Sequence, residues 1–329
     1  MEIAVIGAAG MVGQKLAQRL ARDPVLESGE RVSRMLLVDV APAAVIDSPE
    51  VELETLVADL AEPRVAAEVI GSRPHVIFDL AAVVSGEAEA DFEKGYRVNV
   101  DASRLLFEAV RAAGDRYCPR LVFSSSIAVF GPPMPEVIGD EQRATPETSY
   151  GTQKAIVELL LDDYTRRGFL DGVGLRLPTI CVRPGKPNLA ASGFFSSIIR
   201  EPLNGQSAVL PVSTDVRHWF ASPRAAVVFL IHAATLPSAE LGARRSLTMP
   251  GVSATVAMEI EALRRVGGDP AVALIRAQPD ETIARIVDSW PRAFDARRAT
   301  ALGFRAESDF DEIVDAYIEE ELGGRVGTS

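Results

Sequence analysis

Near the start of the chain the sequence reads Ile3-Ala4-Val5-Ile6, followed directly by Gly7-Ala8-Ala9-Gly10-Met11-Val12-Gly13. The apolar run predicts a buried strand, and the pattern from 11 to 22 predicts a helix. Glycines at this spacing permit a tight turn, a close approach of pyrophosphate to the backbone, and close packing of helix against strand. The start of a helix also offers unpaired N–H groups and a partial positive charge to an anion. We therefore expect a dinucleotide at this turn, in contact with Gly7, Gly10, Met11, Val12 and Gly13.

The rest of the first half continues this alternation of strands and helices. Apolar runs at 35–39, 51–57, 76–80 and 120–123 predict strands, and the patterns at 91–113 and 149–167 predict helices. Short apolar strands separated by helices are typical of a parallel sheet that is covered on both faces. The expected fold class is therefore α/β, a Rossmann-type doubly wound parallel sheet with a smaller C-terminal substrate-capping region. Ligands of such sheets bind beyond the carboxyl ends of the strands.

A carboxylate at the end of the second predicted strand bears on the choice of dinucleotide. Asp39 can accept hydrogen bonds from the hydroxyls of an adenosine ribose, and it would repel a 2′-phosphate. No arginine follows it, because the next residues are Val40-Ala41-Pro42. This favours NAD over NADP. Asp59 and Leu60 follow the next predicted strand and can contact the adenine, although an aspartate that caps a turn fits the sequence almost as well.

The second half of the chain has a less regular pattern. A strand at 172–180 and helices at 225–234, 254–265 and 309–321 are expected, with Pro184, Gly185, Pro187 and Gly193 marking loop-rich sequence. No linker of distinct composition divides the chain. We therefore expect residues 1–177 to form an NAD-binding domain and residues 178–329 to form mainly a substrate-binding cap, with some segments returning to the sheet.

Composition restricts the partners and the compartment. The chain has 329 residues and a net charge of −12, which argues against a nucleic-acid-binding surface, because such surfaces are basic. Cys118 and Cys181 lie beside apolar segments without metal-ligand spacing, so we expect two buried, reduced thiols and no bound metal. The sequence lacks a signal-peptide pattern and an apolar run long enough to span a bilayer. These features favour a cytoplasmic protein that acts on a small molecule.

A second group of residues supplies candidates for the chemistry. The predicted strand at 120–123 leads into Ser124-Ser125-Ser126, and Tyr150 and Lys154 stand four residues apart on a predicted helix. Residues at this spacing face the same way, so both side chains can point at one substrate. A nearby ammonium and a positive nicotinamide ring favour the phenolate and lower the pKa of a tyrosine. We expect Tyr150 to take a hydroxyl proton as NAD takes the hydride, with Ser126 holding the oxygen and Lys154 bonding the nicotinamide ribose.

With these motifs the chain resembles the extended short-chain dehydrogenase/reductase family, which includes nucleotide-sugar epimerases and dehydratases. The resemblance covers nearly the whole chain and implies a Rossmann-type fold with NAD as the cofactor. It also implies that Ser126 is the catalytic serine beside Tyr150 and Lys154. The cofactor contacts expected in addition are made by Ser124, Tyr150, Lys154, Leu80, Ala81, Ala82, Asn99, Pro178 and Ile180.

Three longer segments, 84–92, 175–188 and 217–224, are similar to a narrower group in that family, the dehydrogenases of four-carbon sugar acids. This likeness implies NAD-dependent oxidation of a C2 hydroxyl, with D-erythronate as the substrate and 2-oxo-tetronate as the product. Two departures from the broader family pattern point away from a nucleotide-sugar substrate. Phe130 precedes Gly131 where the family often has tyrosine, and Thr179 stands where epimerases commonly have asparagine.

A sugar acid requires a cation for its carboxylate, and arginine offers a planar fork that matches one. Arg217 is the first candidate, since related epimerases place an arginine there to hold an anion, and Arg183 is the second. A structural ion pair is the alternative role for either arginine. The other residues expected to contact the substrate are Ser85, Ser126, Tyr150 and Thr179.

Two other functions remain compatible with the sequence. A nucleotide-sugar epimerase or dehydratase on the same fold would leave the redox state of its cofactor unchanged overall. A non-catalytic NAD-sensing protein would use the fold without turnover, although such a protein has no need of Tyr150 and Lys154. The resemblance also implies a homodimer, formed through the helices at 91–113 and 149–167.

Overall fold

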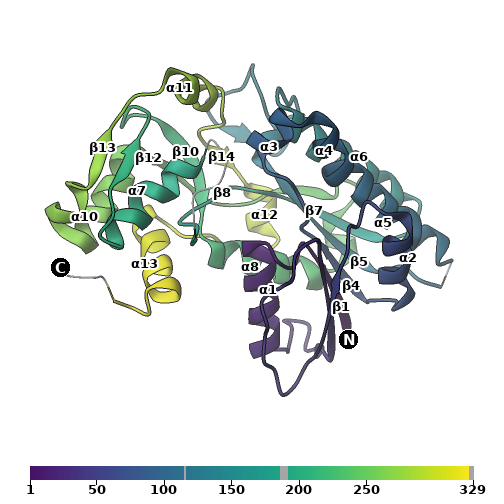
Figure 1. The fold of residues 1–329 in the computed structure, drawn as a ribbon. Helices are drawn as coiled ribbons and strands as arrows, with labels where there is room; N and C mark the ends of the chain where they lie inside the picture. The colour runs from purple at the N-terminus through teal and green to yellow at the C-terminus, as the bar shows by residue number, and fades with distance from the viewer. Residues whose placement is uncertain (115, 186–191, 326–329) are drawn as a thin grey trace. The chain divides into compact units, whose positions relative to one another are not determined.

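The structure, a computed structural model, describes residues 1–114, 116–185 and 192–325 (Figure 1). The chain forms two compact units. The first comprises Met1–Val129, Thr148–Leu177 and Val227–Thr248, and the second comprises Phe130–Glu147, Pro178–Ala226 and Met249–Ser329. The chain therefore crosses repeatedly between the units instead of completing one before it begins the other.

Within the described residues, the first unit is built on a seven-stranded sheet with the order β11-β7-β5-β4-β1-β2-β3. Every neighbouring pair in this sheet is parallel. The strands are β1 (Glu2–Ile6), β2 (Arg34–Asp39), β3 (Glu52–Val57), β4 (Val76–Asp79), β5 (Arg120–Ser126), β7 (Asp171–Leu177) and β11 (Ser246–Thr248). The strand order reverses beside β1, which lies between β2 and β4. Ligands of open parallel sheets bind at such a reversal, and the doubly wound fold expected from the sequence is confirmed.

Helices cover both faces of this sheet. The longer ones are α1 (Met11–Arg22), α2 (Pro63–Gly71), α5 (Ala102–Ala112) and α6 (Ser149–Arg166), and the shorter ones are α3 (Ser85–Ala90), α4 (Phe92–Tyr96) and α9 (Ser238–Leu241). Apolar side chains of α2, α5 and α6 share one core with the central strands, among them Phe107, Leu161 and Ile77. Helix α1 lies on the opposite side of the sheet from α2 and α5 (Figure 1). The predicted helix at 11–22 is confirmed, and the one at 149–167 ends one residue earlier.

The predicted helix at 91–113 is divided in the structure. It consists of α4, a π-helical turn at Arg97–Asp101, and α5. A π turn inserts an extra residue into the helical repeat and often marks a functional position. Apolar periodicity does not detect such an insertion, so the sequence predicted one continuous helix. The turn carries Asn99, whose side chain is buried.

The predicted strand at 172–180 is wrong as a single element. β7 ends at Leu177, and β8 (Thr179–Ile180) belongs to a different sheet in the second unit. Pro178 separates the two strands, because a proline lacks the N–H that a central strand needs. Conversely, β5 extends beyond its predicted end at Phe123, and the serine run forms its last three residues.

The described part of the second unit contains a sheet with the order β12-β10-β8 and the strand pairs β13-β9 and β14-β6. The strands not yet bounded are β6 (Ile138–Gly139), β9 (Ala208–Leu210), β10 (Arg217–Ala221), β12 (Val252–Thr255), β13 (Ile275–Ala277) and β14 (Phe294–Asp295). Its helices are α7 (Gly193–Leu203), α10 (Val256–Val272), α11 (Glu281–Asp288), α12 (Arg297–Ala301) and α13 (Phe310–Glu321). The core includes Phe195, Phe220, Leu263 and Ile313. This unit thus has an apolar core of its own.

Helix boundaries in the second half differ from the sequence-based ones. Helix α8 (Pro223–Thr235) is slightly longer than predicted and passes from the second unit into the first. The helix predicted from 254 begins at Val256, because Thr255 caps it by accepting a hydrogen bond from the Met258 N–H. It continues past a kink at Gly268, whose φ is 67°. Gly193, which indicated a loop, begins α7, and the end of the segment at 175–188 lies outside the described residues.

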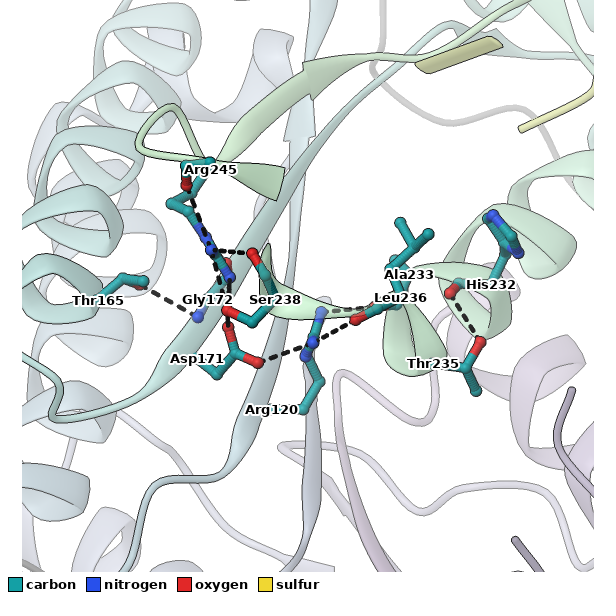
Figure 2. A network of polar contacts seen from close by, with 11 residues as sticks. Arg120, Thr165, Asp171, Gly172, His232, Ala233, Thr235, Leu236, Ser238 and Arg245 are labelled. Carbon is teal, nitrogen blue, oxygen red and sulfur yellow. Dashed lines mark hydrogen bonds and ion pairs between the residues drawn. The ribbon is translucent and has the colours of Figure 1, made fainter. Parts of the chain in front are cut away.

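A network of charged side chains holds the returning segment at 227–248 to the first unit's sheet (Figure 2). The Asp171 carboxylate pairs with the Arg120 guanidinium at 2.7 Å and with the Arg245 guanidinium. Arg120 also donates to the Ala233 carbonyl at 3.1 Å, and Arg245 donates to the Gly172 carbonyl at 2.6 Å. Both arginine side chains are about nine-tenths buried or more. The network thus joins the first residues of β5 and β7 to the end of α8 and to the start of β11.

Candidate active site

The glycine turn between β1 and α1 has the geometry that a dinucleotide requires. Gly7 has a φ of 85°, and a Cβ there would lie 2.7 Å from the backbone nitrogen of Ala81. A Cβ on Gly13 would lie 2.2 Å from the Gly7 carbonyl oxygen. A side chain at Gly7 would therefore displace the segment after β4, and one at Gly13 would displace α1 from the turn. Gly10 is exposed, and a Cβ there would meet only the Gly7 carbonyl oxygen, at 3.3 Å. The backbone at Gly10 is therefore open to the approach of pyrophosphate, and the turn fits NAD.

Asp39 lies beside this turn at the carboxyl end of β2. Its Oδ2 accepts a hydrogen bond from the Ala9 N–H at 2.9 Å, and its Oδ1 accepts one from the Ala41 N–H at 3.1 Å. These bonds fix the carboxylate next to the first residues of α1, where an adenosine ribose is expected. Asp59 instead pairs with the Arg97 guanidinium and accepts from the Ala61 N–H, and the adjacent Leu60 is buried. An adenine contact by either residue stays a prediction.

The segment after β4 lies between the glycine turn and α6. The Leu80 N–H donates to the Ile6 carbonyl at 3.0 Å, and Ala81 lies against Gly7. Ala82 follows directly, and Ser85 is the first residue of α3. Asn99 fixes the backbone of this segment at Val83. Its side chain accepts from the Val83 N–H at 2.9 Å and donates to the Val83 carbonyl at 3.2 Å. It also donates to the Gln153 side chain at 2.7 Å.

The three serines at the end of β5 have different partners. The Ser124 hydroxyl donates to the Asp79 carbonyl at 3.2 Å, and the Ser124 carbonyl accepts from the Lys154 ammonium at 2.8 Å. The Ser125 hydroxyl donates to the Glu158 carboxylate. The Ser126 hydroxyl accepts from the Ala128 N–H at 3.1 Å and lies close enough to Tyr150 to hold the pKa of the phenol down. Of the three serines, Ser126 is therefore the one that the fold brings to the tyrosine.

Tyr150 and Lys154 occupy successive turns at the start of α6. Thr148 caps this helix by accepting from the Gly151 N–H at 3.1 Å. The Lys154 nitrogen lies 5.7 Å from the centre of the Tyr150 ring and 4.7 Å from the centre of the Phe123 ring. Its side chain is buried, whereas Tyr150 is half-buried. The serine, the tyrosine and the lysine thus lie together at the carboxyl ends of β4 and β5.

The two ionisable groups of this cluster are shifted in opposite directions. Burial raises the pKa of Tyr150 to about 12, although the nearby Ser126 hydroxyl acts in the other direction. Burial lowers the pKa of Lys154 to about 8, and the charges of Asp79 and Glu158 oppose that shift. The expected acidification of the phenol by Lys154 is thus absent in the protein alone. Desolvation dominates, because the ammonium is directed at the Ser124 carbonyl and lies nearer to Phe123 than to Tyr150.

In the second unit, Thr179 is hydrogen-bonded to a buried histidine. Its hydroxyl lies 2.7 Å from Nε2 of His218, whose Nδ1 lies 2.9 Å from the Pro291 carbonyl oxygen. A carbonyl can only accept, so Nδ1 carries the proton of the neutral ring and Nε2 accepts from Thr179. Burial lowers the pKa of His218 to about 4, although the bond to Pro291 opposes the shift. The ring also stacks on Phe195 with an interplanar angle of 7°, so His218 is a neutral, packed side chain that orients Thr179.

The two candidate arginines have different surroundings. The Arg217 side chain is exposed and donates to the Ser253 carbonyl at 3.1 Å and to the Ser253 hydroxyl at 3.4 Å. Arg183 is half-buried and donates to the Ser192 hydroxyl at 3.3 Å. Within the described parts of the chain, neither arginine is seen paired with a carboxylate. Pro178 and Ile180 flank Thr179 around β8, so all five residues lie in the second unit.

A model of the NAD-dependent epimerase/dehydratase family matches residues 3–235 of this chain. The chain belongs to this family. NAD is accordingly its cofactor, and the open glycine turn and the fixed Asp39 carboxylate are features of this chain that suit NAD.

Members of the epimerase/dehydratase family that resemble this chain have different names. The chain is 47% identical to D-erythronate dehydrogenase of Cupriavidus necator over 97% of its own length and 98% of that protein. It is 42% identical to D-erythronate dehydrogenase of Haemophilus influenzae over 98% of its length and 100% of that protein. A crystal structure described as the nucleoside-diphosphate-sugar epimerase from Agrobacterium tumefaciens is 58% identical, with a TM-score of 0.96 over 99% of this chain and 96% of that one.

Two buried acids near the site were not identified from the sequence. Asp79 ends the apolar run of β4, and Glu158 lies one turn beyond Lys154 on α6. Both are almost completely buried, and both affect the charge of Lys154. An acid within an otherwise apolar strand is the signal that points to Asp79. Glu158 has no comparable local signal, because charged residues are ordinary on the exposed face of a helix.

Other parts of the described chain offer little further chemistry. No group of three or more His, Cys, Asp or Glu side chains lies together there as a set of metal ligands. None of the described helices is both long and apolar enough to cross a membrane. Cys181 is buried as expected, but Cys118 is exposed, so the expectation of two buried thiols is wrong for Cys118. Cys118 lies in the loop directly before β5, where flanking apolar residues do not ensure burial.

Proposed function

We propose that this protein is an NAD-dependent dehydrogenase that oxidises the C2 hydroxyl of a four-carbon sugar acid, D-erythronate, to 2-oxo-tetronate. Two relatives that match over almost the full chain bear the name D-erythronate dehydrogenase. The observation that carries the chemistry is the cluster in which Ser126 lies beside Tyr150 while Lys154 lies one helical turn away. This cluster lies at the carboxyl edge of the sheet that also holds the glycine turn.

Each residue of the cluster has a separate task in the proposed reaction. Bound NAD supplies the acceptor for the hydride that leaves C2 and a positive charge beside the phenol. Ser126 donates a hydrogen bond to the C2 oxygen, and Tyr150 accepts the hydroxyl proton as the C2–H bond breaks. Lys154 stabilises the phenolate by its charge and bonds the nicotinamide ribose. Since burial raises the pKa of Tyr150 to about 12, the phenol needs this added positive charge before it can act as a base.

Several further residues are proposed to contact the substrate. Arg217 is the first choice for the sugar-acid carboxylate, because its guanidinium is exposed and has only neutral oxygen partners among the described residues. An exposed planar fork of this kind matches a carboxylate with two hydrogen bonds. Thr179, oriented by His218, and Ser85 are proposed to bond the hydroxyls. This division assigns NAD mainly to residues 1–177 and the substrate mainly to residues 178–329.

The direct test is to incubate the purified protein with NAD and D-erythronate. NADH should form in a one-to-one ratio with a 2-oxo acid, followed by absorbance for the first and by mass spectrometry for the second. The variant Tyr150→Phe should lower kcat by about 10²- to 10⁴-fold, the usual contribution of a general base. Its affinity for NAD should stay near that of the wild type in a fluorescence titration. Failure of the wild type to reduce NAD with any four-carbon sugar acid would refute the proposal.

An epimerase is the second candidate, and one observation favours it. The relative with a solved structure at 58% identity bears the name nucleoside-diphosphate-sugar epimerase. An epimerase would interconvert UDP-glucose and UDP-galactose with no net change in NAD. Chromatography of the sugar nucleotides after incubation distinguishes the two functions, since the dehydrogenase should leave UDP-sugars unaltered.

We also infer that the protein forms a homodimer through α4 and α6, within the ranges that the sequence suggested. Phe92 of α4 is 60% exposed and Leu159 of α6 is 71% exposed, although large apolar side chains on helices are usually buried. A second copy of the chain would cover both. The free thiols of Cys118 and Cys181 favour a reducing compartment, so we propose that the dimer acts in the cytoplasm.

A further inference from the structure

Asp79 occupies a buried position close to the Lys154 ammonium. It is the last residue of β4, is 1% exposed, and accepts a hydrogen bond from the Ser103 hydroxyl of α5 at 2.7 Å. The sheet register pairs it with Phe123 of β5. Side chains of paired residues in adjacent strands point to the same face of a sheet. The Lys154 nitrogen lies over the Phe123 ring, so the Asp79 carboxylate and the Lys154 ammonium lie on one face of the sheet, under α5 and α6.

The second acid near Lys154 is already neutralised. Glu158 forms an ion pair with the Arg176 guanidinium, with nitrogen to oxygen distances of 2.7 to 3.2 Å, and it also accepts from the Ser125 hydroxyl. Asp79 has the Ser103 hydroxyl as its partner instead of a guanidinium. Of the two acids, Asp79 therefore carries the larger uncompensated negative charge beside Lys154.

The pKa shifts of Asp79 and Lys154 agree with this arrangement. Burial lowers the pKa of Lys154 to about 8, and Asp79 opposes the shift more strongly than Glu158 does. Burial raises the pKa of Asp79, while the hydrogen bond from Ser103 and the charge of Lys154 hold it down. Each group thus favours the charged form of the other.

Other charged groups on the elements that pack against α6 have partners elsewhere. On α6 itself, the ionisable groups near Lys154 among those described are Tyr150 and Glu158. Besides Glu93 of α4, the groups and their partners include Lys94 with Glu87, Arg97 with Asp59, Arg104 with Asp101, Arg111 with Glu108, and Glu89 with the Ser149 N–H.

We propose that Asp79 is a positioning residue for the proposed dehydrogenase reaction: its carboxylate, held by Ser103, keeps the Lys154 ammonium charged and seated on the Ser124 carbonyl. A neutral lysine would lose both the charge that stabilises the Tyr150 phenolate and a donor for the nicotinamide ribose. The inference rests on the proposed function for its catalytic consequence. Its electrostatic content concerns this chain's residues only and is measurable without cofactor.

The experiment is a titration of Lys154 by NMR in the cofactor-free protein. The chain has four lysines, Lys15, Lys94, Lys154 and Lys186, so protein labelled with [ε-¹³C]lysine gives a simple spectrum. The Lys154 signal is identified by its loss in Lys154→Arg. The wild type should titrate with a midpoint near 8. In Asp79→Asn, which removes the charge and keeps the shape, the midpoint should fall by about one unit.

Two further variants keep the test decisive. Ser103→Ala leaves the carboxylate but removes its donor, which favours protonated Asp79, so the Lys154 midpoint should fall in the same direction by a smaller amount. This variant replaces Asp79→Asn if the latter does not fold. Glu259→Gln is the matched control, because Glu259 is a fully buried acid on α10 of the second unit. It should leave the Lys154 midpoint unchanged.

The kinetic readout is the pH profile of kcat with NAD and D-erythronate. The alkaline limb of the profile should move about one pH unit lower in Asp79→Asn. At pH 8 the protonated fraction of Lys154 then falls from about one half to about one tenth, which reduces kcat about fivefold. If folded Asp79→Asn and Ser103→Ala both titrate like the wild type, the inference is overturned. If the wild type does not reduce NAD at all, the proposed function fails while the NMR result still decides the role of Asp79.

Discussion

At the scale of single residues, burial shifts both ionisable groups of the site, Tyr150 and Lys154, toward their neutral forms when the cofactor is absent. Burial favours the neutral phenol of Tyr150 and also favours loss of the Lys154 proton, so the fold opposes the charged forms that the proposed reaction needs. Asp79 and Glu158 restore the lysine charge, whereas no carboxylate can assist the phenolate. In the proposed mechanism, the positive charge that favours the phenolate is supplied by oxidised NAD. A hydroxyl compound that enters before NAD would therefore meet a protonated tyrosine and remain unreacted.

Arg217 allows a prediction about substrate recognition. Replacing it with alanine should raise KM for D-erythronate about 10- to 100-fold, because a hydrogen-bonded pair with a charged group contributes about 1.5–3 kcal/mol. The KM of Arg217→Lys should lie between those of the wild type and Arg217→Ala, since a lysine keeps the charge but loses the planar fork. Steady-state kinetics give KM, and calorimetry should give an unchanged affinity for NAD. Arg276→Ala, which removes an exposed arginine of β13, is the control, and a similar rise in KM there would contradict the assignment.

The residues in short local motifs are those that the sequence could identify. The glycine turn and the pair Tyr150 and Lys154 depend on spacings of three or four residues, which a strand or a helix fixes directly. Asp79 depends instead on the alignment of β4 with β5 and on a hydroxyl from α5. No local sequence pattern reports that alignment. The position of Asp79 near Lys154 is therefore seen only in the folded chain.

At the scale of elements, the returning segment at 227–248 completes the sheet as β11, and its attachment is mainly polar. Asp171, at the start of β7, receives two guanidinium groups from different parts of the first unit (Figure 2). The rest of β7 was predicted well, because its apolar residues Val173, Leu175 and Leu177 alternate along one short segment. The break after Leu177 and the π turn at Arg97–Asp101 were not predicted, since one depends on a change of sheet and the other on an extra residue in a helical repeat.

Removal of the shared carboxylate should therefore destabilise this unit. We expect Asp171→Ala to lower the free energy of unfolding by about 3–5 kcal/mol, because it leaves the guanidinium groups of Arg120 and Arg245 buried without their counter-charge. Urea denaturation followed by circular dichroism measures the change. Asp288→Ala removes one member of an exposed pair with Arg292 and should cost less than about 1 kcal/mol. Equal losses in the two variants would show that the network has no special role.

At the scale of the whole molecule, the exposed apolar residues of α4 and α6 bear on assembly. Leu159→Glu should convert the proposed dimer to a monomer, because it would place a charge in an apolar interface. Light scattering coupled to size-exclusion chromatography reports the mass. Val45→Glu changes a fully exposed valine outside these helices and should leave the mass unaltered. A wild type that elutes with the mass of one chain would remove the basis for the dimer.

The division of the chain between its units has a consequence for protein synthesis. β11 is an edge strand of the first unit's sheet, yet two of the three segments of the second unit precede it in the sequence. The nascent chain cannot close that sheet until Thr248 has left the ribosome. By then the first two segments of the second unit, Phe130–Glu147 and Pro178–Ala226, have left the exit tunnel. They cannot complete their unit until the third segment, which starts at Met249, has also emerged. No single cut in the chain therefore separates one complete unit from the other, because segments of the two units alternate along the sequence.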